Sequence, residues 1–181
     1  MVEDRIGHRY AKSAFDLAEE KNIVDDARSD MALILDIYNQ NKDFADFLKS
    51  PLISSLKKEA VTNALFEGKL KTDLVDLLVK LVVRKGREMY LPNVAEAFLS
   101  IYDEAKGILR GVFTSATPLP DGVAKEVKSL MEQKTGKTFE MEQGVDPELI
   151  GGFTLKIGDT LFDGSIATSI RKMKREFIKN N

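Results

Sequence analysis

The sequence predicts an α+β fold, with an N-terminal six-helix bundle over residues 1–105 and a small C-terminal α/β module over residues 106–181. Apolar residues recur at helical spacing as far as Ala105. After Gly107 the periodicity shortens, and apolar residues alternate with polar ones as they do in strands. The change in periodicity therefore predicts a domain boundary near residue 106.

Helices with connections of a few residues are typical of a compact antiparallel bundle. The expected helices in the first half cover about 4–21, 25–40, 44–48, 55–67, 73–85 and 92–106. The third helix should stop before Pro51, because a residue that precedes proline avoids the helical region. The fifth should end at Gly86, which suits the left-handed position after a helix, and Pro92 suits the first turn of the sixth.

The second half is expected to mix strands with helices. Strands are predicted at 109–116, 139–142, 153–157 and 161–162, and helices at 121–135 and 165–179. Asp121 and Ser165 are the predicted N-caps of the two helices, because short polar side chains accept hydrogen bonds from the first turn. Gly158-Asp159 is expected to form a two-residue hairpin turn, with glycine first as a type II′ turn prefers.

The composition argues against most kinds of chemistry. The 27 basic and 29 acidic residues nearly balance, unlike those of a strongly basic nucleic-acid binder. There is no cysteine and His8 is the sole histidine, which excludes disulfides, thiol nucleophiles and sites built from several histidines. The glycines near residues 151–164 do not have the spacing of a phosphate-binding loop. We therefore expect no catalytic residue, no metal site and no cofactor.

The sequence also predicts no membrane-spanning segment and no signal peptide. The most apolar stretch, Leu74–Val83, is interrupted by Asp76 and Lys80. It is much shorter than the roughly 20 apolar residues that a spanning helix needs. If the protein works at a membrane, we expect other subunits to hold it there.

Two helices of the first half have unusually wide apolar faces. The apolar residues of the helix at 73–85 cover an arc of about 240°, whereas an ordinary surface helix needs only about 100°. The first helix covers about 200°, with alanine at the centre of its arc. Such helices must bury two sides. Either the fifth helix is the central rod of the bundle, or the two helices leave a shared groove for a partner helix.

Three segments resemble the delta subunit of F-type ATP synthases, whose mitochondrial counterpart is the oligomycin-sensitivity-conferring protein. Arg9–Phe15 resembles the opening helix of that family, and Leu77–Val79 with Lys85–Arg87 and Leu91-Pro92 is similar to its fifth and sixth helices. Ile150–Phe153, with the glycine-containing turns that follow it, resembles the C-terminal signature. The resemblance covers the whole chain.

The resemblance implies a non-catalytic stator role. In this family the N-terminal bundle binds the N-terminal helix of an alpha subunit, and the C-terminal module holds the C-terminal end of the b-subunit stalk. The chain would then be part of a large hetero-oligomer, peripheral on the cytoplasmic side of the cell membrane, and would help the head to resist rotor torque during proton-driven ATP synthesis. No nucleic acid and no direct membrane insertion are expected.

The candidate residues fall into two groups. For the alpha-subunit helix they are Tyr10, Ser13, Ala14, Leu17, Leu74, Leu78 and Leu81. For structural turns they are Gly152, Gly158, Asp159, Asp163, Gly164 and Ser165. Burying about four apolar side chains of the first group would contribute roughly 6–12 kcal/mol before the costs of association.

The alternative hypothesis is a helical RNA-binding adaptor that uses the basic last helix. The cations concerned are Arg171, Lys172, Lys174, Arg175 and Lys179. Such a cluster could contact a phosphate backbone. It is also what the negative C-terminal end of a helix dipole favours, without any ligand.

Overall fold

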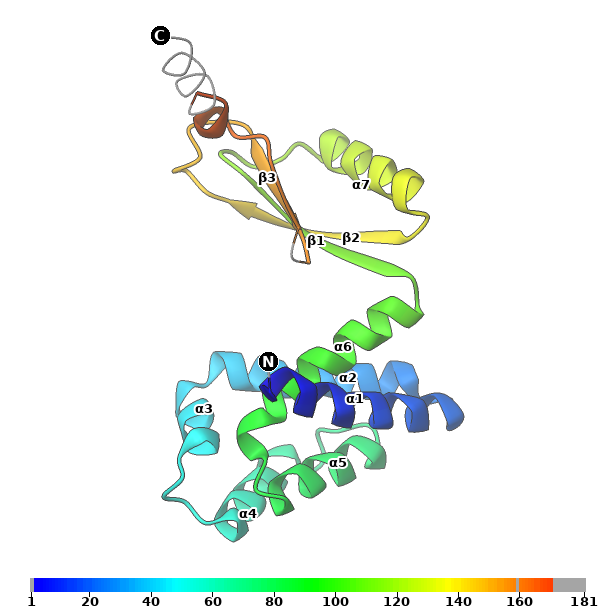
Figure 1. Cartoon of the computed structure of the whole chain (residues 1–181), viewed down its shortest axis with the longest axis vertical. Coiled ribbons are helices and arrows are strands. Elements are labelled where there is room, and N and C mark those ends of the chain that lie inside the picture. The colour runs from blue at the N-terminus through cyan, green and yellow to red at the C-terminus, as the bar shows by residue number, and fades with distance from the viewer. Residues whose placement is uncertain (1, 159, 171–181) are drawn as a thin grey trace. The chain divides into compact units, whose positions relative to one another are not determined.

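The computed structural model describes residues 2–158 and 160–170 of the chain. The chain divides into two compact units, unit 1 (Met1–Tyr102) and unit 2 (Asp103–Asn181). Unit 1 is helical, whereas unit 2 contains a four-stranded sheet (Figure 1). This is the α+β fold that the sequence predicts.

Short turns and local caps delimit the helices of unit 1. They are α1 (Val2–Glu20), α2 (Val24–Gln40), α3 (Lys42–Lys49), α4 (Ser55–Phe66), α5 (Asp73–Arg84) and α6 (Leu91–Ala105), with the 3₁₀ turn η1 (Glu88–Tyr90) before α6. Ser50, which precedes proline, is extended and ends α3. Gly86 has a φ of +65°, so the chain leaves α5 through the left-handed region as expected.

Helix α5 contacts α1, α2, α4 and η1. Its residues Val75, Val79 and Val82 are almost completely buried. Phe98 of α6 is also completely buried, and its ring centroid lies 5.7 Å from that of Phe15 on α1. The core therefore takes apolar side chains from helices far apart in the sequence.

Two close contacts fix α1 and α5 in unit 1. Gly7 allows α1 to approach α6, because a Cβ atom there would lie 2.8 Å from the carbonyl oxygen of Asn93. Asp30 of α2 is buried and accepts hydrogen bonds from the backbone N–H groups of Lys71 and Thr72 at 2.8 and 2.9 Å. The Thr72 side chain in turn caps α5 by accepting from the N–H of Val75.

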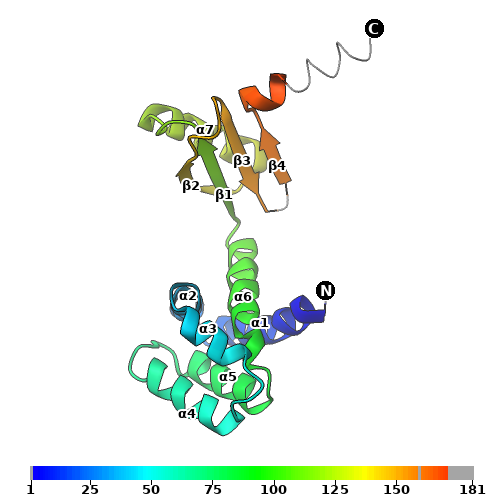
Figure 2. The same cartoon turned by 90° about the vertical axis from the view of Figure 1, so that its left-hand side faces the viewer.

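Unit 2 is built around a sheet with the strand order β2-β1-β3-β4 (Figure 2). Its elements are β1 (Ile108–Ser115), α7 (Asp121–Thr135), β2 (Thr138–Val145), β3 (Phe153–Ile157) and β4 (Thr160–Asp163). Strands β1 and β2 are parallel and α7 connects them, whereas β3 is antiparallel to both β1 and β4. Phe113, Phe139 and Leu155 form the buried core, against which Val127 and Met131 of α7 pack.

The structure corrects two local predictions in unit 2. Asp121 does not cap α7, because Pro120 occupies the cap position in an extended conformation, with no side-chain hydrogen bond. Asp121 is the first helical residue. Strand β2 continues to Val145, beyond the alternating residues at 139–142, since it pairs with β1 along its whole length.

The last predicted helix is described only in part. Residues 166–170 are helical. The hydroxyl oxygen of Ser165 accepts a hydrogen bond from the N–H of Thr168 at 3.2 Å, as expected of an N-cap. The remainder of the predicted helix, with the basic residues considered for RNA binding, lies outside the described residues.

Candidate partner-binding surface

Helices α1 and α5 lie side by side and run in opposite directions (Figure 1). Tyr10, in the first half of α1, meets Arg87, which follows the C-terminal end of α5. Nη1 of Arg87 donates a hydrogen bond of 2.9 Å to the Tyr10 hydroxyl. The guanidinium carbon of Arg87 lies over the Tyr10 ring, 5.7 Å from its centroid. This contact joins the two helices at one end.

The residues predicted for partner binding divide by burial. Ala14, Leu74 and Leu78 are 4%, 9% and 8% exposed and belong to the core of unit 1. Leu17 and Leu81, by contrast, are 38% and 44% exposed. These two side chains are available to a partner, whereas the first three support the packing of α1 and α5.

The two polar candidates are already engaged within unit 1. Tyr10 is half-buried and accepts the hydrogen bond from Arg87. Ser13 is exposed, but its hydroxyl donates to the carbonyl oxygen of Arg9 at 3.0 Å. The Ser13 hydroxyl therefore keeps its acceptor capacity for a partner, while its proton is used within α1.

The residues predicted for partner binding do not include Leu77. It is 63% exposed, the most exposed apolar side chain of α5. It lies one helical turn before Leu81, so the two leucines adjoin on the exposed side of the helix. The wide apolar arc of α5 already includes Leu77, but only the packing of the neighbouring helices shows that this part of the arc stays uncovered.

The structure agrees in part with both explanations of the wide apolar arc, the central helix of the bundle and the groove for a partner helix. α5 is central, because it packs against several other elements and buries most of its apolar residues. The exposed remainder consists of Leu77 and Leu81, with Leu17 on the neighbouring helix. We define these three side chains as the leucine surface.

The predicted turn residues of unit 2 gather where β3 and β4 meet the segments that flank them. Gly152 has a φ of +83°, and a Cβ atom there would lie 2.4 Å from the carbonyl oxygen of Gly164. The N–H of Gly164 donates to the carbonyl oxygen of Phe153 at 2.9 Å. The Asp163 carboxylate accepts from the N–H of Ser165 at 2.9 Å and from the hydroxyl of Thr168 at 2.7 Å.

The predicted hairpin connects β3 to β4. Ile157 pairs with Thr160, so residues 158 and 159 form the connection. Gly158 has a φ of +54°, which suits the first position of a type II′ turn. Asp159 itself lies outside the described residues.

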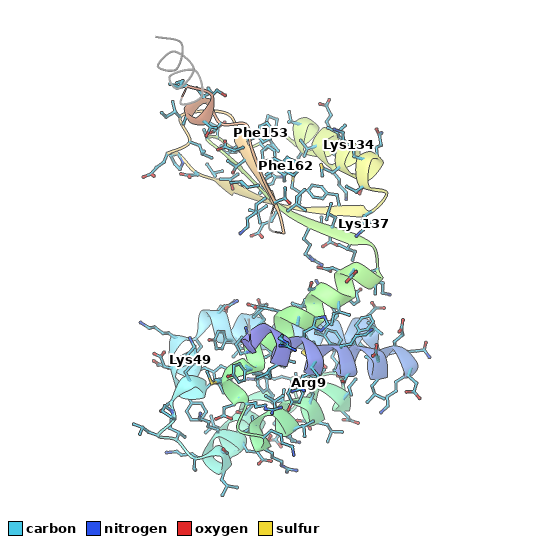
Figure 3. All side chains as sticks on the ribbon, in the orientation of Figure 1. Arg9, Lys49, Lys134, Lys137, Phe153 and Phe162 are labelled. Atoms are coloured by element: carbon cyan, nitrogen blue, oxygen red, sulfur yellow. The ribbon has the colours of Figure 1, made fainter. Side chains whose placement is uncertain are left out.

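Unit 2 also exposes apolar side chains. Phe153 and Phe162, on neighbouring strands, are 42% and 52% exposed (Figure 3). Ile166 and Ile170, one helical turn apart after β4, are 48% and 51% exposed. The opposite face of the sheet carries a shallow cavity of about 340 Å³ lined by charged groups such as Arg110, Glu140 and Lys156.

Lys49 and Tyr38 interact in the lining of a small cavity of unit 1. It has a volume of about 310 Å³ and is lined in part by Tyr38, Lys49 and Met89. The Lys49 ammonium lies 5.7 Å from the centroid of the Tyr38 ring, and its side-chain hydrogen bond with Tyr38 raises the pKa of Lys49 (Figure 3). Because lysine is already cationic at neutral pH, this shift leaves its charge there unchanged.

The part of the chain that the structure describes contains neither a metal-binding cluster nor a membrane-spanning helix. No group of three or more His, Cys, Asp and Glu side chains is placed to hold a metal ion among these residues. Within the same residues, no helix has both the length and the hydropathy that crossing a bilayer requires.

Comparisons with known proteins agree along almost the whole chain. Residues 6–177 match the family model described as ATP synthase delta (OSCP) subunit. The protein named ATP synthase subunit delta from Symbiobacterium thermophilum is 34% identical over 98% of this chain and 95% of its own length. The protein of the same name from Chlorobium phaeobacteroides is 33% identical over 94% of this chain and 93% of its own.

A solved structure shares the fold. One chain of the mitochondrial ATP synthase hexamer of Toxoplasma gondii superimposes with a TM-score of 0.73. It covers 95% of this chain and 97% of its own length, at 24% sequence identity.

Proposed function

The chain belongs to the ATP synthase delta (OSCP) subunit family, and from this premise we propose how it ties the catalytic head of an ATP synthase to the peripheral stalk. Unit 1 binds the N-terminal helix of an alpha subunit between α1 and α5. The module at residues 106–181 binds the C-terminal end of the b-subunit stalk. The link is non-catalytic, and it lets the head resist rotor torque during proton-driven ATP synthesis.

The observation that carries this proposal is the leucine surface. Leu77, Leu81 and Leu17 are 63%, 44% and 38% exposed on helices whose other apolar side chains are mostly buried. An amphipathic helix can cover such a surface with its own apolar face. Complete burial of the exposed parts would contribute about 2–4 kcal/mol before the costs of association.

This contribution is smaller than the roughly 6–12 kcal/mol expected for four apolar side chains of the candidate set, because Leu74 and Leu78 are already buried within unit 1. An isolated helix bound through the leucine surface would therefore bind only weakly. When both units of one chain attach to the same complex, the overall binding is stronger, because the first attachment raises the effective concentration for the second. The proposed clamp thus depends on unit 1 and unit 2 both being engaged.

The exposed apolar side chains of unit 2, Phe153, Phe162, Ile166 and Ile170, support a second attachment. We assign them to the b-subunit stalk as part of the same proposal. The protein is then held peripherally on the cytoplasmic side of the cell membrane through the rest of the complex. The comparisons lend no support to the RNA-binding alternative.

The test is co-purification of a tagged full-length chain from native membranes. We expect alpha and b subunits to accompany the unaltered chain. A variant with Leu77→Asp and Leu81→Asp should lose the alpha subunit in the wash while it keeps the b subunits. Recovery of neither subunit with the unaltered chain would contradict the proposal.

A further inference from the structure

Strand β2 forms one edge of the sheet in unit 2, and no described strand pairs with its outer side (Figure 2). It is eight residues long, whereas β4 at the other edge has four. It pairs with β1 residue by residue from Thr138 to Val145 and contains neither proline nor lysine. Proteins commonly protect an exposed edge with prolines, lysines, bulges or very short strands. Strand β2 has none of these, so its regular edge is open to another strand.

The hydrogen bonds of β2 show which of its backbone groups face outward. The N–H group of Thr138 donates to the carbonyl oxygen of Gly107, on the β1 side, at 3.0 Å. Successive residues of a strand direct their N–H and C=O groups to opposite edges, so the odd-numbered residues of β2 face away from β1. After Phe139 these outward residues are Met141, Gln143 and Val145.

One outward N–H group of β2 is already bonded. Phe139 donates it to Oε1 of Glu132, on α7, at 3.1 Å. This acceptor comes from a helix and not from a neighbouring strand, which agrees with the outward direction of the group. For Met141, Gln143 and Val145 the described part of the chain supplies no acceptor of this kind. The edge is therefore closed at its N-terminal end and free along the rest.

Two carboxylates lie along the free edge, on the face of the sheet opposite α7. Glu140 and Glu142 are exposed there, because side chains alternate and Phe139 is buried on the face that α7 covers. Glu140 pairs with Arg110, its neighbour on β1, at 2.6 Å. Glu142 has Val112 as its neighbour on β1 and makes no ion pair with a residue that the structure describes. A cation beside Glu142 must therefore come from the outer side of the strand.

The side chains on the other face of this edge are mostly apolar. Met141 packs against the core of unit 2, and Val145 is 53% exposed. Residues that lie opposite each other on neighbouring strands share a face of the sheet and interact in pairs. An added strand would thus meet carboxylates at every second position and apolar side chains at most of the positions between them.

We infer that the outer edge of β2 binds an extended segment of a partner protein by strand addition, and that basic and apolar side chains alternate along this segment. Its backbone groups pair with those of Met141, Gln143 and Val145. Its basic side chains lie beside Glu140 and Glu142. The inference is independent of the proposed function, which assigns the exposed side chains on β3, β4 and the segment after β4 to the stalk.

Charge disfavours a second copy of this chain as the partner. Pairing β2 with the same strand of another copy would bring two acidic edges together, and like charges on paired strands are destabilising. A basic segment, in contrast, supplies the cation that Glu142 lacks within its own sheet. The edge thus discriminates between partners through charge while its backbone groups provide the attachment.

The test uses the full-length chain and a synthetic peptide, capped at both ends, in which lysine and valine alternate. We expect calorimetric titration at low ionic strength to show binding, and a peptide with glutamate in place of lysine not to bind. Glu142→Lys should weaken binding of the lysine peptide about tenfold. Glu126→Lys, at an exposed position of α7, makes the same change of net charge away from the edge and should leave binding unchanged.

A proline substitution separates strand addition from simple charge attraction. Gln143→Pro removes an outward N–H group and keeps the bonds to β1, because proline is tolerated at an edge position whose N–H faces solvent. It should weaken binding of the lysine peptide about tenfold or more and leave the thermal transition nearly unchanged. Gln143→Ala keeps the N–H group and should retain binding.

Amide hydrogen exchange gives a second readout, resolved by residue. The lysine peptide should slow the exchange of the outward N–H groups of Met141, Gln143 and Val145. The N–H groups of Glu140 and Glu142 face β1, so their exchange should be slow with or without the peptide.

Each outcome supports or overturns the inference. It is overturned if the lysine peptide fails to bind the unaltered chain, if exchange at the three outward residues does not change, or if a folded Gln143→Pro variant binds equally well. If Gln143→Pro loses its cooperative thermal transition, the exchange measurement on the unaltered chain decides. Equal binding of both peptides overturns the basic character of the partner. A dimer of the unaltered chain that the lysine peptide dissociates, seen by sedimentation, would make a second copy the occupant and also overturn it.

Discussion

The ammonium of Lys58 lies 2.6 Å from the carboxylate of Glu88, and both side chains are buried in unit 1. Lys58 Nζ also donates to the carbonyl oxygen of Leu48 at 2.8 Å. The pair joins α4 to η1 across thirty residues of sequence, and the bond to Leu48 adds α3. The second carboxylate oxygen, Oε2, has no hydrogen-bond partner among the described residues.

This pair predicts an asymmetric response to substitution. Lys58→Met should lower the free energy of unfolding by about 3–5 kcal/mol, because it leaves the Glu88 carboxylate buried without its partner. The double variant Lys58→Met with Glu88→Leu should recover most of that loss, since no unpaired charge remains. Urea denaturation followed by circular dichroism measures both. A double variant no more stable than Lys58→Met would contradict this account.

The exposed and buried leucines of α5 should behave differently. Leu81→Asp is expected to weaken binding of an alpha-subunit N-terminal peptide and to leave the thermal melt nearly unchanged, because its side chain is 44% exposed. Leu78→Asp buries an unpaired carboxylate at a position that is 8% exposed, so it should unfold or strongly destabilise unit 1. Calorimetric titration and circular dichroism separate the two effects. Unchanged peptide affinity with Leu81→Asp would remove this leucine from the docking surface.

A glycine substitution tests the strained turn before β3. Gly152→Ala should destabilise unit 2 by about 2 kcal/mol or more, because φ is +83° and the new Cβ atom would clash with Gly164. Gly122→Ala is the matched control. Its Cβ atom would meet nothing within 4 Å in α7, so it should stabilise by about 0.5–1 kcal/mol. Thermal denaturation of both variants checks the prediction, and equal melting temperatures would refute it.

The first half of the chain should fold without the second. A truncated chain of residues 1–105 contains the whole of unit 1 together with the end of α6. Its core consists of residues within this segment, so we expect a single cooperative thermal transition with helical circular dichroism. A gradual loss of signal without a transition would show that unit 1 needs residues 106–181.

Most element boundaries could be predicted because their signals are local. Pro51, Gly86 and Ser165 end or begin helices through their own backbone and side-chain chemistry, and the structure has each in that place. The predicted cap of α7 is wrong because N-cap preference favours an aspartate, whereas the helix begins one residue earlier, with Asp121 as its first residue and Pro120 at the cap position.

The candidate surface was predictable only in outline. The width of the apolar arc identifies α1 and α5, since it depends on the order of residues in each helix alone. The arc does not show which leucines are exposed. Leu74 and Leu78 are covered while Leu77 is open, and that difference depends on where the neighbouring helices cross α5.

The sequence by itself determined the α+β class, the order of the elements and the family resemblance, because these follow from periodicity and from residues close together in the chain. The tertiary structure alone decided that Lys58 pairs with Glu88 and that Leu77 remains exposed. Both depend on contacts between helices that are distant in sequence. Such contacts arise from the packing of side chains in three dimensions, and a local sequence pattern does not predict this packing.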